Sequence, residues 1–193
     1  MASISIPTER RRIDDPVELA AYVARAGLAY ERWPVEGRIV QGADSAAVLA
    51  AYAPEVERLK REGGYVTADV IDVTSQTPGL DAMLAKFNRE HSHSEDEVRF
   101  IVAGAGIFFI RPAQGPVFAI QVETGDLLRV PAGTRHWFEL CADRRIRAIR
   151  LFVDPSGWAP HYFDDGVHAE YSPLCWGPRY LPPAQPGPAQ PGL

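Results

Sequence analysis

The chain contains only two cysteines, Cys141 and Cys175, among 193 residues. So few cannot form the disulfide framework of small secreted proteins, and we expect two inert thiols in a reducing, cytoplasmic compartment. The sequence also lacks an apolar run long enough to span a membrane. The N-terminus lacks an apolar segment followed by a small-residue cleavage site, so no secretory signal is expected. These absences indicate a soluble cytoplasmic protein.

Basic residues are also scarce relative to acidic ones. The chain has 20 Lys and Arg against 25 Asp and Glu, for a net charge of -5. This balance argues against nucleic acid or an anionic membrane as a partner. The length and ordinary apolar content fit one globular domain. Because residues 181–193 are rich in proline and glycine, we predict one domain over residues 1–180 and a disordered tail over 181–193.

The N-terminal half shows helical signals. An aspartate cap and a following proline predict a helix within residues 14–27. Apolar residues recur at helical spacing over residues 45–62, where an internal proline predicts a kink or two abutting helices. A Thr-Pro pair at residues 77–78 predicts the start of a third helix that leads toward a histidine cluster. Residues 28–33 and 65–73 are expected to be strands.

From residue 91 onward, short apolar runs alternate with turn signals. This rhythm is typical of an antiparallel sandwich or barrel. Gly104-Ala-Gly106 is interpreted as one of the turns. The predicted fold class is therefore mainly β, with a few N-terminal helices on a barrel. The expected strands are residues 98–102, 107–110, 117–122, 127–130, 136–140 and 146–153.

The most distinctive stretch contains His91, His93 and Glu97. Residues two apart on a strand face the same side, so both imidazoles can point to one place. A short turn or bulge can bring Glu97 to the same place. Two neutral imidazoles and a carboxylate suit a first-row transition metal.

Both parts of the two-part cupin signature are present. The first part, His-x-His-x3-Glu-x6-Gly, is matched by His91, His93, Glu97 and Gly104. The second part, Gly-x5-Pro-x-Gly-x2-His, is matched by Gly125, Pro131, Gly133 and His136. The chain therefore resembles the cupins. The resemblance implies a jelly-roll barrel that holds a metal through His91, His93, Glu97 and His136.

A closer resemblance is to the acireductone dioxygenases of methionine salvage. Residues 87–100, 131–138 and 148–152 carry it most strongly, and it extends over roughly residues 15 to 180. It implies one Fe²⁺ or Ni²⁺ ion per chain and an acireductone, 1,2-dihydroxy-3-keto-5-methylthiopentene, as the substrate that reacts with O₂. The iron form gives formate and 4-methylthio-2-oxobutanoate, and the nickel form gives methylthiopropionate, formate and carbon monoxide. The resemblance also suggests a monomer.

Two arginines occur among apolar residues of predicted strands. Arg99 lies two residues after Glu97, and Arg150 lies in the run 146–153. A buried arginine needs an anionic partner. Both could stabilise the substrate anion, for which the planar guanidinium fork is well shaped. Alternatively, one of them braces the barrel through Glu90, Glu95 or Asp96.

Three aromatic residues, Phe87, Phe138 and Trp158, are candidates for an apolar wall around the thioether tail, with simple core packing as the alternative. His161 and His168 lie outside both motifs and are expected to be solvated. Glu95 and Asp96 are expected to lie in a solvated turn, with an acidic shell around the cationic site as the alternative.

Two other functions would fit the same fold. A zinc-dependent sugar-phosphate isomerase would need a cluster of Lys and Arg at the barrel mouth, and the candidates are only Arg99, Arg135 and Arg150. A non-catalytic cupin would often have lost a ligand, whereas this chain keeps all four. The dioxygenase hypothesis is therefore favoured.

Overall fold

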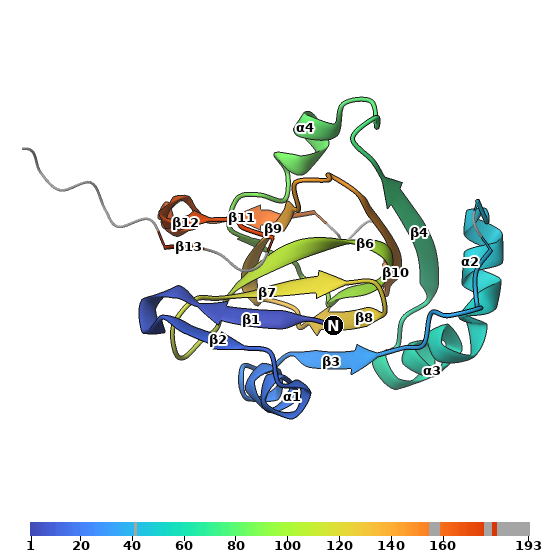
Figure 1. The fold of residues 1–193 in the computed structure, drawn as a ribbon, viewed down its shortest axis with the longest axis horizontal. Coiled ribbons are helices and arrows are strands. Elements are labelled where there is room, and N and C mark those ends of the chain that lie inside the picture. The colour runs from blue at the N-terminus through green and yellow to red at the C-terminus, as the bar shows by residue number, and fades with distance from the viewer. Residues whose placement is uncertain (41, 155–158, 176–178, 181–193) are drawn as a thin grey trace, which may run out of the picture.

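The computed structural model describes residues 1–40, 42–154, 159–175 and 179–180. In these residues the chain is mainly β, with short helices in the N-terminal half (Figure 1). The helices are α1 (Pro16–Arg25), α2 (Ser45–Ala51), α3 (Ala53–Gly63) and α4 (Leu80–Leu84), with 3₁₀ turns at Pro7–Glu9 and Val167–Glu170. The strands are β1 (Ser3–Ile6), β2 (Arg11–Ile13), β3 (Ala29–Arg32), β4 (Thr67–Val73), β5 (His91–Ser92), β6 (Glu97–Arg111), β7 (Phe118–Glu123), β8 (Asp126–Val130), β9 (Arg135–Leu140), β10 (Ile146–Phe152), β11 (His161–Tyr162), β12 (Tyr171–Ser172) and β13 (Arg179–Tyr180). None of the described helices has the length and apolar character needed to cross a membrane.

Strand β6 organises the sheet. Its first part pairs with β8 and β10, and its second part pairs with β7 and β9. The pairing continues on one side through β10 to β4 and β8 to β3, and on the other through β7 to β1 and β9 to β5. All these pairs are antiparallel, and the strands wrap around a common interior (Figure 1). The predicted mainly β fold with helical decoration is confirmed.

The turn predicted at Gly104-Ala-Gly106 is wrong, because β6 runs through it. Gly104 has a φ of 84°, which an L side chain rarely adopts. A Cβ on Gly104 would lie 2.1 Å from the carbonyl oxygen of Arg145. The pairing of β6 with β10 also shifts register between Arg147 and Ala148, next to this point. The glycine therefore permits a bend within one strand, where β6 passes from one group of partners to the other.

The N-terminal strands were not predicted. Residues 3–6 form β1, which pairs with both β2 and β7 and extends the sheet. The side chains of Ile4 and Ile6 are fully buried. A four-residue strand with only two apolar positions is a weak signal, and it forms here because β7 supplies its hydrogen-bond partners.

The helices mostly follow their sequence signals. The Asp15 carboxylate caps α1 by accepting from the backbone N–H groups of Val17 and Glu18. The proline-interrupted segment forms two helices, α2 and α3, beside β4 (Figure 1). The predicted start of α4 is wrong by two residues, because the helix begins at Leu80 and not at Pro78. The hydroxyl of Thr77 accepts from Thr74 N instead of capping, and Gly79 precedes the helix.

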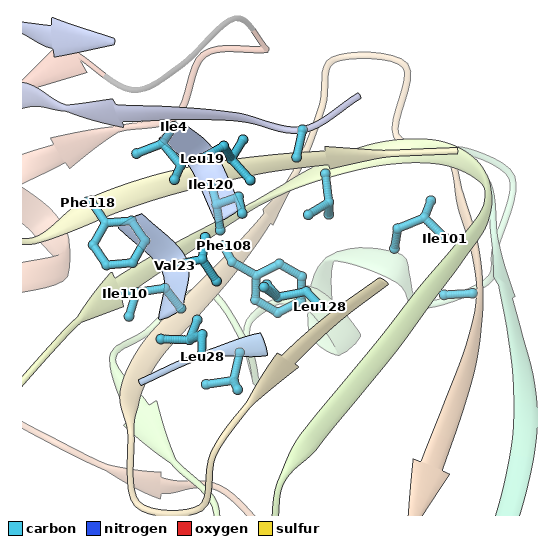
Figure 2. Close-up of a cluster of buried hydrophobic side chains, with 14 of the residues drawn as sticks. Ile4, Leu19, Val23, Leu28, Ile101, Phe108, Ile110, Phe118, Ile120 and Leu128 are labelled. Atoms are coloured by element: carbon cyan, nitrogen blue, oxygen red, sulfur yellow. The ribbon is translucent and has the colours of Figure 1, made fainter. Parts of the chain in front are cut away.

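Helix α1 completes the main core of the barrel. Leu19 and Val23 project from α1 toward Ile4 and Ile120 of the sheet, and all four side chains are buried (Figure 2). The Tyr22 ring meets Phe118 edge-on, with 5.1 Å between the ring centroids. Burial of each large aliphatic or aromatic side chain contributes about 1.5–3 kcal/mol. This packing fixes the sheet that carries the polar residues of the interior.

Candidate metal centre

Four titratable side chains meet inside the barrel. One ligand atom from each of His91, His93, Glu97 and His136 lies within 4.8 Å of the others, and all four residues are buried. His91 of β5 is directly opposite His136 of β9, while Glu97 begins β6. His136 Nε2 lies 2.9 Å from Glu97 Oε2, and His93 Nε2 lies 3.4 Å from the same oxygen. The two sequence motifs thus converge on one point.

Backbone carbonyls orient two of the imidazoles. His91 Nδ1 lies 2.7 Å from the carbonyl oxygen of Arg89, and His136 Nδ1 lies 2.8 Å from that of Thr134. A donating Nδ1–H leaves Nε2 as the lone-pair nitrogen directed at the cluster, as metal-binding histidines require. The turn before β9 is tied to the same place, because Gly133 N donates to the His93 carbonyl oxygen at 2.8 Å.

The electrostatics of the cluster suit a cation. Burial alone would raise the pKa of Glu97, but the charge of Arg99 and the nearby His136 and His93 rings bring that pKa well below its usual value. Burial and the nearby His136 lower the pKa of His91 to about 4. At neutral pH the site therefore presents a carboxylate and a neutral His91.

The cluster fits a transition-metal ion. His91 Nε2 is buried and has no hydrogen-bond partner among the residues that the structure describes. Such an atom is costly to bury unless something binds it. Ligands of one ion lie at most about 4.2 Å apart, close to the spread of these four atoms. Three imidazoles and one carboxylate form a donor set that iron, nickel and zinc all accept.

Two arginines flank the carboxylate side of the cluster. Arg99 is buried, and its Nη2 lies 3.1 Å from Glu97 Oε1. Burial lowers the pKa of Arg99 to about 10, so it stays charged at neutral pH. Arg150 lies directly opposite Arg99 on β10 and donates to both carboxylate oxygens of Asp69, at 2.7 and 2.5 Å. Asp69 was not among the partners considered from sequence.

A cavity opens from the cluster into the barrel. Its polar end contains His91, Glu97, Arg99 and Arg150, and its remaining wall is apolar. Phe87 and Phe138 both contribute to this wall, and Phe138 N donates to the Phe87 carbonyl oxygen at 2.8 Å. Trp158 lies outside the described residues. The sequence did not single out the other apolar lining residues, which are Ile71, Val73, Met83, Leu84, Ile101, Phe108, Leu140, Ile146 and Ala148.

The two acidic residues before Glu97 anchor neighbouring segments. Glu95 accepts from the backbone N–H groups of Val153 and Asp154. Asp96 accepts from Ala132 N at 3.0 Å and from the Tyr65 hydroxyl at 2.8 Å. The expectation of a merely solvated turn is therefore wrong, and neither residue pairs with Arg99 or Arg150 through the contacts seen here.

The remaining histidines lie away from the cluster. His161 is exposed, as expected. His168 is half-buried instead of solvated, and its ring centroid lies 6.4 Å from that of Trp137.

Comparison with known proteins identifies the family. The ARD/ARD' family model matches residues 14–160. An acireductone dioxygenase from Synechococcus sp. (strain CC9605) is 40% identical over 161 residues, which is 83% of this chain and 86% of that protein. One from Pseudomonas paraeruginosa (strain PA7) is 44% identical over 154 residues, which is 80% of this chain and 84% of that protein.

A solved structure agrees with these matches. Acireductone dioxygenase from Bacillus anthracis, with a cadmium ion in its active center, superimposes with a TM-score of 0.78 at 38% identity. The match covers 84% of this chain and 98% of that one. With a buried three-histidine, one-glutamate cluster, a family match over most of its length and this shared fold, the chain belongs to the ARD/ARD' family of metal-dependent acireductone dioxygenases.

Proposed function

We propose that the chain cleaves 1,2-dihydroxy-3-keto-5-methylthiopentene with O₂, using one Fe²⁺ or Ni²⁺ ion held by His91, His93, Glu97 and His136. Family membership and the buried cluster support this assignment. A bound ion of either kind supplies Lewis-acid charge and open coordination positions for the oxygens of the substrate. The observation that carries the proposal is the cavity, which joins the cluster, two arginines and an apolar wall in one interior space.

Arg99 and Arg150 bind the ionised enediol. Both line the polar end of the cavity beside Glu97. Arg99 remains protonated because its pKa of about 10 is well above neutrality. Two fixed guanidinium groups favour the enediolate over the neutral enediol and therefore promote loss of its proton. The bidentate contact with Asp69 fixes the plane of the Arg150 guanidinium.

The apolar wall receives the methylthio tail. Phe87 and Phe138 lie on this wall, and a hydrophobic surface excludes water from the neighbouring reactive oxygens. A substrate with its enediol at the polar end directs its tail toward Met83 and Leu84 of α4, which line the same cavity.

The products would depend on which ion the four ligands hold. With iron they would be formate and 4-methylthio-2-oxobutanoate, the keto acid that returns to methionine. With nickel they would be methylthiopropionate, formate and carbon monoxide. The same four side chains serve both metals, because imidazole and carboxylate ligands accept either ion.

A zinc isomerase of sugar phosphates is less well supported. Among the described lining residues of the cavity, Arg99 and Arg150 are the only arginines and no lysine is present, and both arginines already contact carboxylates. A phosphate site would need further donors there.

Elemental analysis of the purified chain, paired with a product assay on the acireductone under O₂, tests the proposal. We expect iron or nickel near one per chain and release of formate. Stoichiometric zinc without O₂ consumption would support the isomerase instead, and failure to take up any of these metals on reconstitution would refute the four-ligand site.

A further inference from the structure

A second charged cluster lies behind the metal-site histidines. It consists of Glu90, Arg111, Arg135 and Asp165, called here the clamp. Arg135 Nη2 lies 2.7 Å from Glu90 Oε2 and 2.6 Å from Asp165 Oδ2. Arg111 Nη1 lies 3.3 Å from Glu90 Oε2 and 2.7 Å from Asp165 Oδ2. Each arginine thus bridges both carboxylates, and the four charges sum to zero.

The clamp contacts the two histidine-bearing strands at adjacent positions. Glu90 immediately precedes His91, and Arg135 immediately precedes His136. Because successive residues of a strand face opposite sides, each clamp residue projects away from the cluster that its neighbour enters. The strands β5 and β9 pair at His91 and His136. The Glu90–Arg135 contact links the same two strands on the face opposite to the histidine side chains.

The same positions control the carbonyls that orient the imidazoles. The acceptor for His91 Nδ1 is the carbonyl of Arg89, one residue before Glu90. The acceptor for His136 Nδ1 is the carbonyl of Thr134, one residue before Arg135. Movement of Glu90 or Arg135 therefore displaces both an imidazole and the carbonyl that holds it. Such outer contacts determine how well a metal site is formed.

The clamp also fastens a distant segment over β5. Phe163 N donates to the Glu90 carbonyl oxygen at 3.0 Å, and the Arg135 guanidinium carbon lies 3.9 Å from the centre of the Phe163 ring. Tyr162 of β11 pairs directly with His91. The short strand β5 is thus covered on its outer edge by the segment that carries Asp165.

A contribution to folding stability does not explain why the residues of the clamp are charged. Arg111 and Arg135 are directly opposite each other on β6 and β9, and like charges at such positions are unfavourable. Glu90 is fully buried, which is costly for a carboxylate. Apolar residues in place of a buried ion pair often stabilise a protein equally well or better. Charge-assisted hydrogen bonds have fixed directions, whereas apolar packing would not hold the side chains in one orientation.

We propose that the clamp is a positioning device for metal binding, in which Glu90 and Arg135 set the directions of the His91 and His136 imidazoles. This inference rests on the metal site proposed above. It assigns a role to residues that contact neither the ligand atoms nor the cavity, and it predicts that disruption of the clamp weakens metal binding more than it weakens the fold.

The test is Glu90→Gln, with Co²⁺ as the probe. Gln keeps the shape of the side chain but removes the charge that both arginines contact. We expect the apparent Co²⁺ affinity, measured in competition with a chelator, to fall about 10–100-fold. We also expect the visible absorption bands of bound Co²⁺ to shift, because the ligand directions change. A purely structural role would leave these bands unchanged.

Asp126→Asn provides a matched control. Asp126 is equally buried and accepts from Tyr30 and Arg32, but it lies on β8 outside the cluster. We expect this variant to lose thermal stability while its Co²⁺ affinity and absorption bands stay as in the wild-type chain. Arg135→Lys, which retains the charge without the fork, should retain more affinity than Arg135→Gln.

The outcomes separate two failures. If the wild-type chain binds no Co²⁺, the proposed four-ligand metal site is refuted, and the clamp inference is refuted with it. If the wild-type chain binds Co²⁺ and Glu90→Gln matches it in affinity and absorption, only the clamp inference is overturned. If Glu90→Gln does not fold, Asp165→Asn decides by the same criteria, because half of the clamp contacts involve Asp165, which is exposed.

Discussion

The Phe138 ring occupies the space in which a side chain on Gly106 would lie. A Cβ placed on Gly106 would be 2.3 Å from Cζ of Phe138. Phe138 lines the cavity, and its ring centroid lies 4.8 Å from that of Phe108. The absence of a side chain at Gly106 therefore sets the position of one wall of the cavity.

Gly106→Ala should push the Phe138 ring toward the cavity. We expect a loss of about 1–3 kcal/mol in unfolding free energy from overpacking and a higher KM for the acireductone. Thermal denaturation and steady-state kinetics measure the two effects.

The double variant Gly106→Ala/Phe138→Leu checks this explanation, because Leu removes the clashing ring atoms. The double variant should be less destabilised than the sum of the single variants. Simple additivity would mean that Gly106 is needed for another reason.

His136→Ala should abolish stoichiometric metal binding and turnover, because Nε2 of His136 faces the cluster. His161→Ala is the control, since His161 is exposed on β11 beside β5. Metal content by elemental analysis should fall to background in the first variant and stay near one per chain in the second. Equal metal content in both variants would remove His136 from the ligand set.

Arg99→Lys should retain the metal but reduce kcat about 100-fold, because an ammonium group cannot reproduce the guanidinium fork beside Glu97. Arg32→Lys, at the ion pair with the buried Asp126 outside the cavity lining, should leave kcat unchanged. Steady-state kinetics with metal-loaded proteins gives the comparison. A kcat for Arg99→Lys equal to that of the wild-type chain would assign Arg99 a structural role.

Cys141 should resist alkylation in the folded protein. Burial, and to a smaller extent the neighbouring Cys175 thiol, raises the pKa of Cys141 to about 12. Because the thiolate is the nucleophile and the raised pKa lies far above pH 8, little thiolate is present there. The rate should rise about tenfold per pH unit up to that pKa.

Peptide mass spectrometry of iodoacetamide adducts measures Cys141 separately from Cys175 in the wild-type chain, with the urea-unfolded chain as the reactive control. Modification of Cys141 in the folded chain at the rate of the unfolded chain would contradict the prediction.

The residues of the candidate centre were the most predictable part of the molecule. His91 and His93 have the two-residue spacing of a strand, although β5 itself ends at Ser92, and the turn before His136 returns the chain to the same place. Both features depend on residues that are close in the sequence, so the residue spacing is enough to predict them. The structure brings all four predicted residues together.

Contacts between distant strands were not predictable in the same way. Asp69 and Arg150 are 81 positions apart, and they meet only because β4 and β10 pair in one register. A shift by one residue would direct Asp69 to the other face. The clamp has the same origin, since Asp165 reaches Arg111 across 54 positions. Sequence periodicity identifies which residues share a face, but it does not identify the neighbouring strand.

The continuity of β6 also has a consequence for the order of folding. β6 starts beside Glu97, bends at Gly104 and carries partners on both edges along most of its length. Its pairs with β9 and β10 can form only after long chain segments have closed, and structures dominated by such distant pairs fold in milliseconds to seconds. We therefore expect the metal-site residues, which are spread from β5 to β9, to come together only once β9 has paired with β6. On that order of events, a metal ion binds to strands that have already paired.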